Sequence, residues 1–251
     1  MTEMPTTFFG WVGFLFQEYG DLFLKGAGTT LLLAVVGTVI GFLIGLLAGI
    51  VRTVRVDKKD PWIKKILMKI VQGVLVAYIE VFRATPMIVQ AALIYYGTMY
   101  INIDMPALTA GLVTISINTG AYMAEIVRGG IISVDKGQTE GAQSLGMTHW
   151  QTMTSVVLPQ AIRNIMPAIG NEFVINIKDS AVLSIISVPE LFFQTKSAAG
   201  TYFQYFPAYL ITCIIYFAMT FVITRILMAL EKKMDGPASF VIKDELQRRA
   251  L

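Results

Sequence analysis

The sequence predicts an all-α membrane protein with five transmembrane helices and one long polar loop, and three observations lead to this fold class. Of the 251 residues, 55% are hydrophobic and only 15% are charged, whereas soluble domains average about 25% charged residues. Apolar stretches long enough to cross a bilayer recur along the chain, and basic residues gather in three of the segments between them. A soluble enzyme of this composition would expose too much apolar surface to water.

The expected transmembrane helices follow from windows of about 20 residues with few or no charges. Uncharged windows occupy residues 26–51, 84–103, 105–124 and 197–224. A further candidate, at about 166–188, contains Glu172, Lys178 and Asp179, so hydropathy alone leaves it undecided. Together the windows predict one domain over residues 1–251, with spans at about 26–51, 80–101, 105–127, 166–188 and 203–228.

The distribution of Lys and Arg predicts how these helices are oriented. Sixteen of the 20 Lys and Arg residues lie in three segments, 52–69, 128–163 and 225–249. Basic residues favour the cytoplasmic side of a membrane, and only an odd number of spans places all three segments there. The pattern therefore supports the helix at 166–188 and predicts an outside N-terminus and a cytoplasmic C-terminus.

The first residues differ from a signal peptide because no Lys or Arg precedes Lys25. Aromatic residues are frequent over residues 8–16, as in segments that lie on a membrane surface. We expect this segment to lie on the outer membrane surface; the alternative is a loosely ordered tail.

Residue counts exclude several kinds of chemistry. The single cysteine, Cys213, has no partner for an internal disulfide, and with the single histidine, His149, it cannot complete a zinc site. The sequence has no G-x-x-x-x-G-K-[ST] string, so no P-loop binds ATP in this chain. We expect no metal site, no cofactor and no nucleic-acid partner.

A ridge of small residues runs along the first expected span. It consists of Gly37, Gly41, Gly45 and Gly49. Small residues at i and i+4 allow two helix backbones to approach closely in lipid. The ridge predicts a tight helix contact, either with a second subunit or with another helix of the same chain.

Polar residues line one face of each of two expected spans, because residues four and seven apart share a helix face. The residues at these spacings are Thr114, Asn118 and Glu125 in one span, with Tyr122 beside them, and Glu172, Asn176 and Asp179 in the other. A charge at the centre of a membrane helix costs about 2.5–3.5 kcal/mol. These faces should therefore point to the bundle interior or to a water-filled path.

Two interpretations of these polar residues stay open. As a translocation path, the candidates are Asn118, Tyr122, Glu172 and Asn176. The alternative is a set of structural ion pairs near the helix ends. Structural or gating roles are expected for Glu80, Arg83, Pro86, Glu125, Arg128, Lys178 and Asp179. Pro86 should kink the second span, either as part of a gate or as a simple bend at the membrane surface.

The loop at about 129–159 is too polar to cross a membrane and too rich in helix-forming residues to be a simple linker. Gly146 separates two short helical pieces, and Thr148 is a favourable N-cap for the second. A helix–glycine–helix of this kind on the cytoplasmic side predicts a docking element for a soluble partner.

The motifs in and around this loop resemble a known family. Glu140, Gly141 and Ala142, followed by Gly146 and by Leu158 and Pro159, resemble the E-A-A loop of ABC importer permeases. Residues 82–86, F-R-A-T-P, resemble the F-R-G-T-P of the polar amino acid permease subfamily, and residues 120–131 resemble its G-A-Y-x-A-E-x-x-R-G-G-I. Gly141 departs from the usual Ala, which loosens that helix by about 1 kcal/mol.

The resemblance implies a type I ABC importer permease in the cytoplasmic membrane of a prokaryote. It implies that two permease subunits, identical or related, form the translocation path and that an external protein delivers the amino acid. Two separate ATPase subunits, which carry ATP and Mg²⁺, would bind the loop. The residues so implied in coupling to the ATPase are Glu140, Gly141, Ala142, Gly146, Leu158 and Pro159.

Two other classes of protein remain as alternatives. A self-contained secondary transporter or channel for small polar solutes would favour repeated halves and broken helices at the midplane, and the sequence has no such symmetry. A membrane enzyme would require a nucleophile with a base or a metal site, and His149 lies in the polar loop beside Trp150. We therefore expect no enzymatic activity in this chain.

Overall fold

The computed structural model describes residues 4–54 and 61–234, and all regular structure in this part of the chain is helical. The helices are α1 (Phe8–Thr53), α2 (Trp62–Ala84), α3 (Met87–Tyr100), α4 (Ala107–Ser133), α5 (Lys136–Ser144), α6 (His149–Thr152), α7 (Leu158–Asp179), α8 (Leu191–Tyr202) and α9 (Tyr205–Met234). A π-helical turn, Met153–Val157, precedes α7, and a 3₁₀ segment, Ser180–Ile186, follows it. The predicted all-α class is confirmed.

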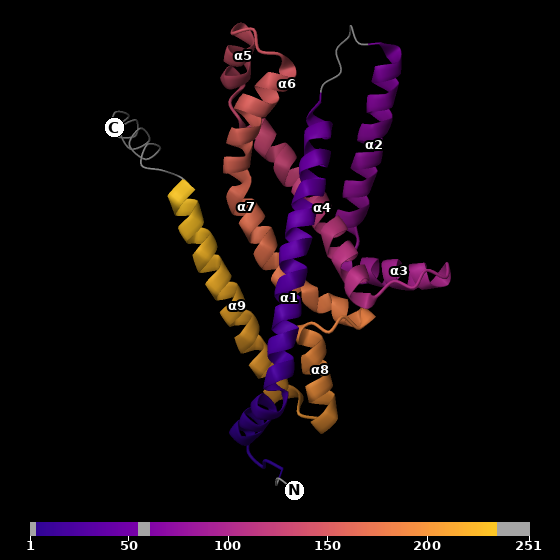
Figure 1. The fold of residues 1–251 in the computed structure, drawn as a ribbon, viewed down its shortest axis with the longest axis vertical. Helices are drawn as coiled ribbons and strands as arrows, with labels where there is room; N and C mark the ends of the chain where they lie inside the picture. The colour runs from indigo at the N-terminus through magenta and orange to yellow at the C-terminus, as the bar shows by residue number, and fades with distance from the viewer. Residues whose placement is uncertain (1–3, 55–60, 235–251) are drawn as a thin grey trace.

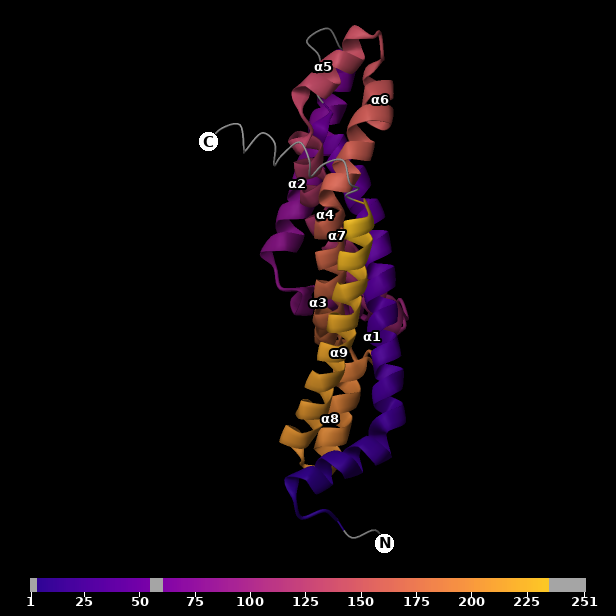
Figure 2. The same cartoon turned by 90° about the vertical axis from the view of Figure 1, so that its left-hand side faces the viewer.

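The helices form a long, narrow bundle. Helices α5 and α6 lie at one end, and the N-terminus and α8 lie at the other (Figure 1). The same two ends are seen from the side (Figure 2). Three helical stretches in the described residues are long and apolar enough to cross a membrane, namely Phe8–Thr53, Ala107–Ser133 and Tyr205–Lys233.

The centre of the bundle is the contact between α1 and α4. Each glycine of the ridge lies against one α4 residue: Gly37 against Ile115, Gly41 against Thr119, Gly45 against Met123 and Gly49 against Val127. A methyl group at Gly41 would lie only 2.7 Å from Thr119 Cβ. The ridge therefore packs against a helix of the same chain, and the alternative of a subunit contact through this ridge is wrong.

The window expected to form one span at 80–101 is divided between α2 and α3. The chain turns sharply between these two helices, so that α3 projects sideways from the bundle (Figure 1). The break falls at Thr85, which has extended backbone angles, and at Pro86. Proline disfavours a helical conformation in the residue before it, and its missing N–H removes a helix hydrogen bond. The expected kink is thus a corner.

The later windows also differ in detail from continuous spans. The window at 166–188 begins inside α7 and ends in the 3₁₀ segment. The uncharged window at 197–224 is divided between α8 and α9, because the chain reverses at Phe203, whose φ of 56° is left-handed. The expected span at 203–228 lies almost entirely within α9.

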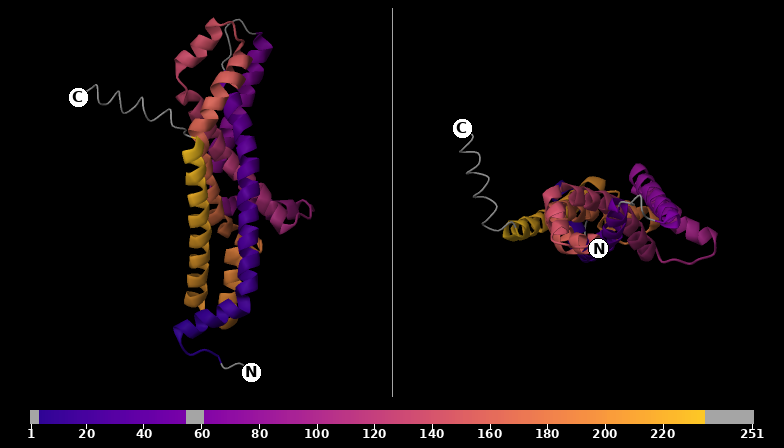
Figure 3. Two further views of the ribbon diagram at one scale, coloured as in Figure 1. Left: turned by 60° about the vertical axis from the view of Figure 1, so that its left-hand side comes forward. Right: turned by 90° about the horizontal axis from the view of Figure 1, so that it is seen from above.

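The aromatic N-terminal segment is helical from Phe8 onward and continues directly into α1. This first part of α1 is turned aside from the axis of the rest (Figure 3). It packs against α8 and α9, with Phe14 against Tyr202 and Phe8 against Phe206. The alternative of a loosely ordered tail is therefore wrong for residues 8–16.

The three basic segments have their described parts at the same end of the bundle. That end is where α5 and α6 lie, and it also includes the start of α2 and the C-terminal ends of α1 and α9 (Figure 1). The N-terminus and the turn between α8 and α9 lie at the opposite end (Figure 3). The common end of these segments is consistent with the predicted orientation, which stays a prediction.

Candidate functional site

The polar loop between α4 and α7 is built on a glycine-terminated helix. Helix α5 ends at Ser144, and Gly146, two residues further on, has a φ of +83°. The Gly146 N–H donates to the Gln143 carbonyl at 2.9 Å, and the Met147 N–H donates to the Ala142 carbonyl at 3.2 Å. This pair of bonds is a Schellman motif, which needs a left-handed residue where Gly146 stands. The predicted turn at Gly146 is confirmed.

The second half of the loop is fixed just as locally. Thr148 caps α6 through a capping box, in which the Gln151 N–H donates to Thr148 Oγ1 and the Thr148 N–H donates to Gln151 Oε1. The π-helical turn then leads into α7, where Leu158 and Pro159 occupy the first positions. The Leu158 N–H donates to the Met153 carbonyl, so the helix is continuous across the π turn, and Pro159, which has no N–H, stands where the π pattern gives way to α.

The inner side of the loop is apolar and buried, and its outer side carries exposed apolar residues. Val134, Met153 and Val157 join the apolar cluster between α4 and α7, and Ala142 is also buried. In contrast, Leu145 and Trp150 are 85% and 70% exposed, and Glu140 and Gly141 are exposed beside them. The loop is thus a rigid frame that presents two large apolar side chains at the tip of the molecule.

The corner between α2 and α3 is held by two side-chain amides, that of buried Gln90 and that of half-buried Asn118. Gln90 Nε2 donates to the carbonyl oxygens of Phe82 at 2.9 Å and Thr85 at 3.0 Å. Asn118 of α4 donates to Gln90 Oε1 at 2.9 Å. Carbonyls released at a helix break need such donors in an apolar setting. Asn118, predicted as a path residue, therefore contacts the corner, and Gln90 was missed although it stands four residues after Pro86.

Asn176 lies between three helices of the same subunit. Its Nδ2 donates to Thr38 Oγ1 of α1 at 2.8 Å, and its Oδ1 accepts from Thr119 Oγ1 of α4 at 3.0 Å. The residue is 4% exposed. Asn176 therefore links α7 to the α1–α4 pair in this conformation.

Glu172 is half-buried one turn before Asn176, and its carboxylate forms no hydrogen bond or ion pair with any other described residue.

The remaining charged and aromatic candidates have few contacts. The guanidinium of Arg83 lies 5.5 Å from the ring centroid of Tyr122, which is a cation–π contact. Lys178 and Asp179 are exposed at the end of α7, and Glu80 is exposed on α2. Within the described residues, neither Glu80 and Arg83 nor Lys178 and Asp179 form an ion pair.

Glu125 joins α1 and α4 near the polar-loop end of the bundle. It pairs with Arg52 of α1 and with Arg128, whose Nη2 lies 2.9 Å from Glu125 Oε2. The three side chains are only partly exposed. Arg52 was not predicted as a partner, because 73 residues separate it from Glu125. The arrangement agrees with the structural role expected for Glu125 and Arg128.

Comparison with protein families matches residues 65–236 to a family described as "binding-protein-dependent transport system inner membrane component". The chain is 36% identical over 215 residues to the glutamine transport system permease protein GlnP of Escherichia coli strain K12, covering 85% of this chain and 93% of GlnP. It is 42% identical over 156 residues to a probable amino-acid ABC transporter permease protein of Bacillus subtilis strain 168, covering 62% of this chain and 69% of that protein.

Two solved structures are similar over most of their length. One, described as an amino acid ABC transporter with histidines, gives a TM-score of 0.78 at 39% identity, covering 92% of this chain and 100% of that chain. The MetNI methionine ABC transporter in an inward-facing conformation gives a TM-score of 0.66 at 20% identity, covering 84% of this chain and 97% of that chain. At this identity the similarity is one of fold alone.

Proposed function

The chain belongs to the family of binding-protein-dependent transport system inner membrane components, as its motifs indicate, and from this premise we propose that it is the permease subunit of an ATP-driven amino acid importer. The observation that carries the proposal is the polar loop, with Leu145 and Trp150 exposed on a rigid frame at the tip of the bundle. Two large apolar side chains exposed at this position do not stabilise an isolated subunit. They indicate a contact with a protein partner that covers them.

The partner that fits this surface is an ABC ATPase. We propose that two ATPase subunits bind the loops of two permease subunits, which are identical or related. The ATPase subunits would also bind ATP and Mg²⁺. The contact would be made by the exposed side of α5 at Glu140 and Gly141 and by the turn at Gly146. Buried Ala142 would support it from within, and Leu158 and Pro159 would connect it to the start of α7. A movement of the ATPase would then reach α7 directly, because the π-helical turn joins the loop to α7 without a flexible linker.

The opposite end of the bundle would face an amino-acid-binding protein outside the cell. We propose a multi-pass protein of the prokaryotic cytoplasmic membrane, with the N-terminus outside and the C-terminus inside. Five passes result if α2 and α3 together make one crossing and α7 with its 3₁₀ segment makes another. The common end of the basic segments supports this orientation (Figure 1).

For the translocation path we propose Glu172 as the residue that meets the substrate, with Tyr122 as a further lining residue. A carboxylate without an internal partner suits the ammonium group of an amino acid. Asn118 and Asn176 would border the path while holding the helices in place through the hydrogen bonds described above.

Gly146→Val tests the coupling role of the loop. Valine at a left-handed position is strained. Gly28→Val is the matched control, because Gly28 lies in α1 away from the loop and a Cβ there meets no atom within 4 Å. With the purified ATPase and binding protein in proteoliposomes, Gly146→Val should lose ATPase binding and uptake, and Gly28→Val should keep both. Normal assembly and transport by Gly146→Val would refute the docking role. Uptake by this chain without an ATPase would favour a secondary transporter.

A further inference from the structure

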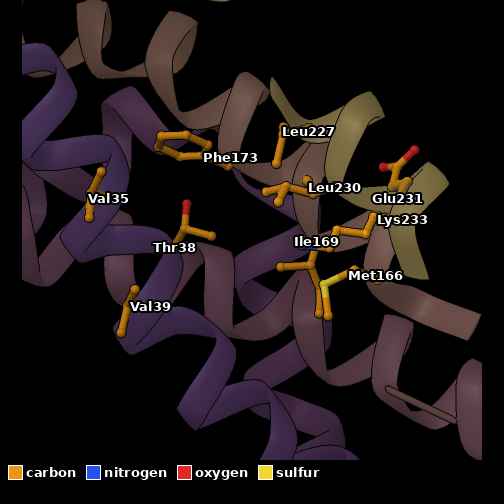
Figure 4. Close-up of a pocket in the computed structure, with 11 residues that line it drawn as sticks. Val35, Thr38, Val39, Met166, Ile169, Phe173, Leu227, Leu230, Glu231 and Lys233 are labelled. Atoms are coloured by element: carbon orange, nitrogen blue, oxygen red, sulfur yellow. The ribbon is translucent and has the colours of Figure 1, made fainter. Parts of the chain in front are cut away.

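An apolar cavity of about 510 Å³ lies between α1, α7 and α9 (Figure 4). This volume is in the range of about 300–1,000 Å³ that is usual for ligand sites. Its apolar lining residues are Val35, Val39, Met166, Ile169, Gly170, Phe173, Leu227 and Leu230. Thr38 also lines it, but its hydroxyl already accepts a hydrogen bond from Asn176. The wall thus offers almost nothing to a polar solute.

The cavity is open to the surroundings of the bundle. Val35 and Val39 on its α1 side are 47% and 54% exposed. Both lie inside the uncharged stretch of α1 that is expected to cross the membrane. At that depth the surrounding medium is hydrocarbon, so an acyl chain can enter from the side.

Charge is found at one place on the rim. Glu231 and Lys233, in the last turn of α9, complete the lining (Figure 4). They lie toward the end of the bundle that carries the basic segments (Figure 1). A lipid with its acyl chain in the cavity would therefore have its headgroup beside one carboxylate and one ammonium group.

We propose that this cavity binds phosphatidylethanolamine, a phospholipid whose headgroup carries a phosphate and a primary ammonium. The phosphate complements Lys233, and the ammonium complements Glu231, to which it can also donate hydrogen bonds. Basic sites between membrane helices bind lipid headgroups in this way, and Glu231 adds selection for the ammonium. The inference goes beyond the transport function and depends only on the chain being a membrane protein.

The test measures lipid retained by the assembled transporter. The complex is purified from bilayers with equal amounts of phosphatidylethanolamine, phosphatidylglycerol and phosphatidylcholine, and bound lipid is counted by native mass spectrometry. Val39→Phe, which places a larger side chain in the wall of the cavity, should lower the amount of bound lipid per chain. Val222→Phe is the matched control, because Val222 is 53% exposed on α9 and does not line the cavity.

Two charge variants test the headgroup assignment. Glu231→Gln should reduce the preference for phosphatidylethanolamine about three- to fivefold, the size expected for a partly exposed ion pair. Lys233→Gln should weaken all three lipids, whereas Lys232→Gln, on the neighbouring face, should weaken none. Equal or stronger retention of phosphatidylglycerol would overturn the proposal, since Lys233 would then recognise phosphate alone. Unchanged lipid counts in Val39→Phe would show that the cavity is not the binding site.

Discussion

Gly45→Ala should separate the two central helices of the subunit. A Cβ at this position would lie 2.7 Å from both the backbone nitrogen of Ala124 and the carbonyl carbon of Met123. Ordinary van der Waals contact begins at 3.4 Å. Because backbone atoms cannot rotate away, α1 and α4 must move apart by about 1 Å and lose dispersion contacts along the seam.

The magnitude follows from two opposing effects. Overpacking of this kind costs about 1–3 kcal/mol, while alanine favours a helix interior over glycine by about 1 kcal/mol. Gly28→Ala isolates the second effect, because Gly28 lies in the same helix and a Cβ there meets nothing within 4 Å. The difference between the two variants is therefore the cost of the clash.

Thermal unfolding of the purified chain in detergent, followed by tryptophan fluorescence, measures this difference. For a chain of this size, 1 kcal/mol corresponds to about 2–4 °C, so Gly45→Ala should unfold about 2–12 °C below Gly28→Ala. Equal unfolding temperatures for the two variants would refute the close α1–α4 seam.

Three further predictions concern the corner, the orientation and the path. Gln90→Leu leaves the Thr85 carbonyl without its side-chain amide donor and should lower stability by about 1–3 kcal/mol. Gln17→Leu, an exposed control, should not, and equal unfolding temperatures of the two variants would contradict the role of the amide. In a Cys213→Ser background, an impermeant thiol reagent on intact cells should label Lys196→Cys and leave the loop variant Lys136→Cys unlabelled; the reverse pattern would invert the topology. Glu172→Gln should lower substrate affinity about 10- to 150-fold with the complex still assembled; unchanged uptake, or loss of assembly, would exclude a substrate contact.

Features that depend on neighbouring residues were predictable from the sequence. Gly146 and Thr148 were assigned correctly because a Schellman turn and a capping box form within a few residues of chain. The glycine ridge predicted a close helix contact for the same reason, since its spacing is a property of one helix. Its partner, α4, was not predictable, because four-residue spacing says how near another helix can come and not which one it is.

The polar side chains of the spans show where prediction from sequence ends. Their spacing indicated that Asn118 and Asn176 face the bundle interior, and both do. Their partners, Gln90 and Thr38, lie 28 and 138 residues away, and no local pattern connects residues so far apart. The sequence likewise indicated a kink at Pro86 but not a corner, because the corner depends on the buried amide of Gln90, which replaces the lost backbone donors.

These contacts separate the polar residues of the spans into two groups. The amide of Asn176 has both its donor and its acceptor atom engaged within the subunit, and the amide nitrogen of Asn118 donates to Gln90. The carboxylate of Glu172, in the same bundle and half-buried, engages no other described residue. A carboxylate is costly in a membrane without a partner, so the partner of Glu172 must come from beyond the subunit's described residues, as water, a second permease or the transported ammonium group. Among the proposed path residues, we therefore expect Glu172 to be the one at which a passing substrate binds and leaves without first breaking the contacts that hold the helices together.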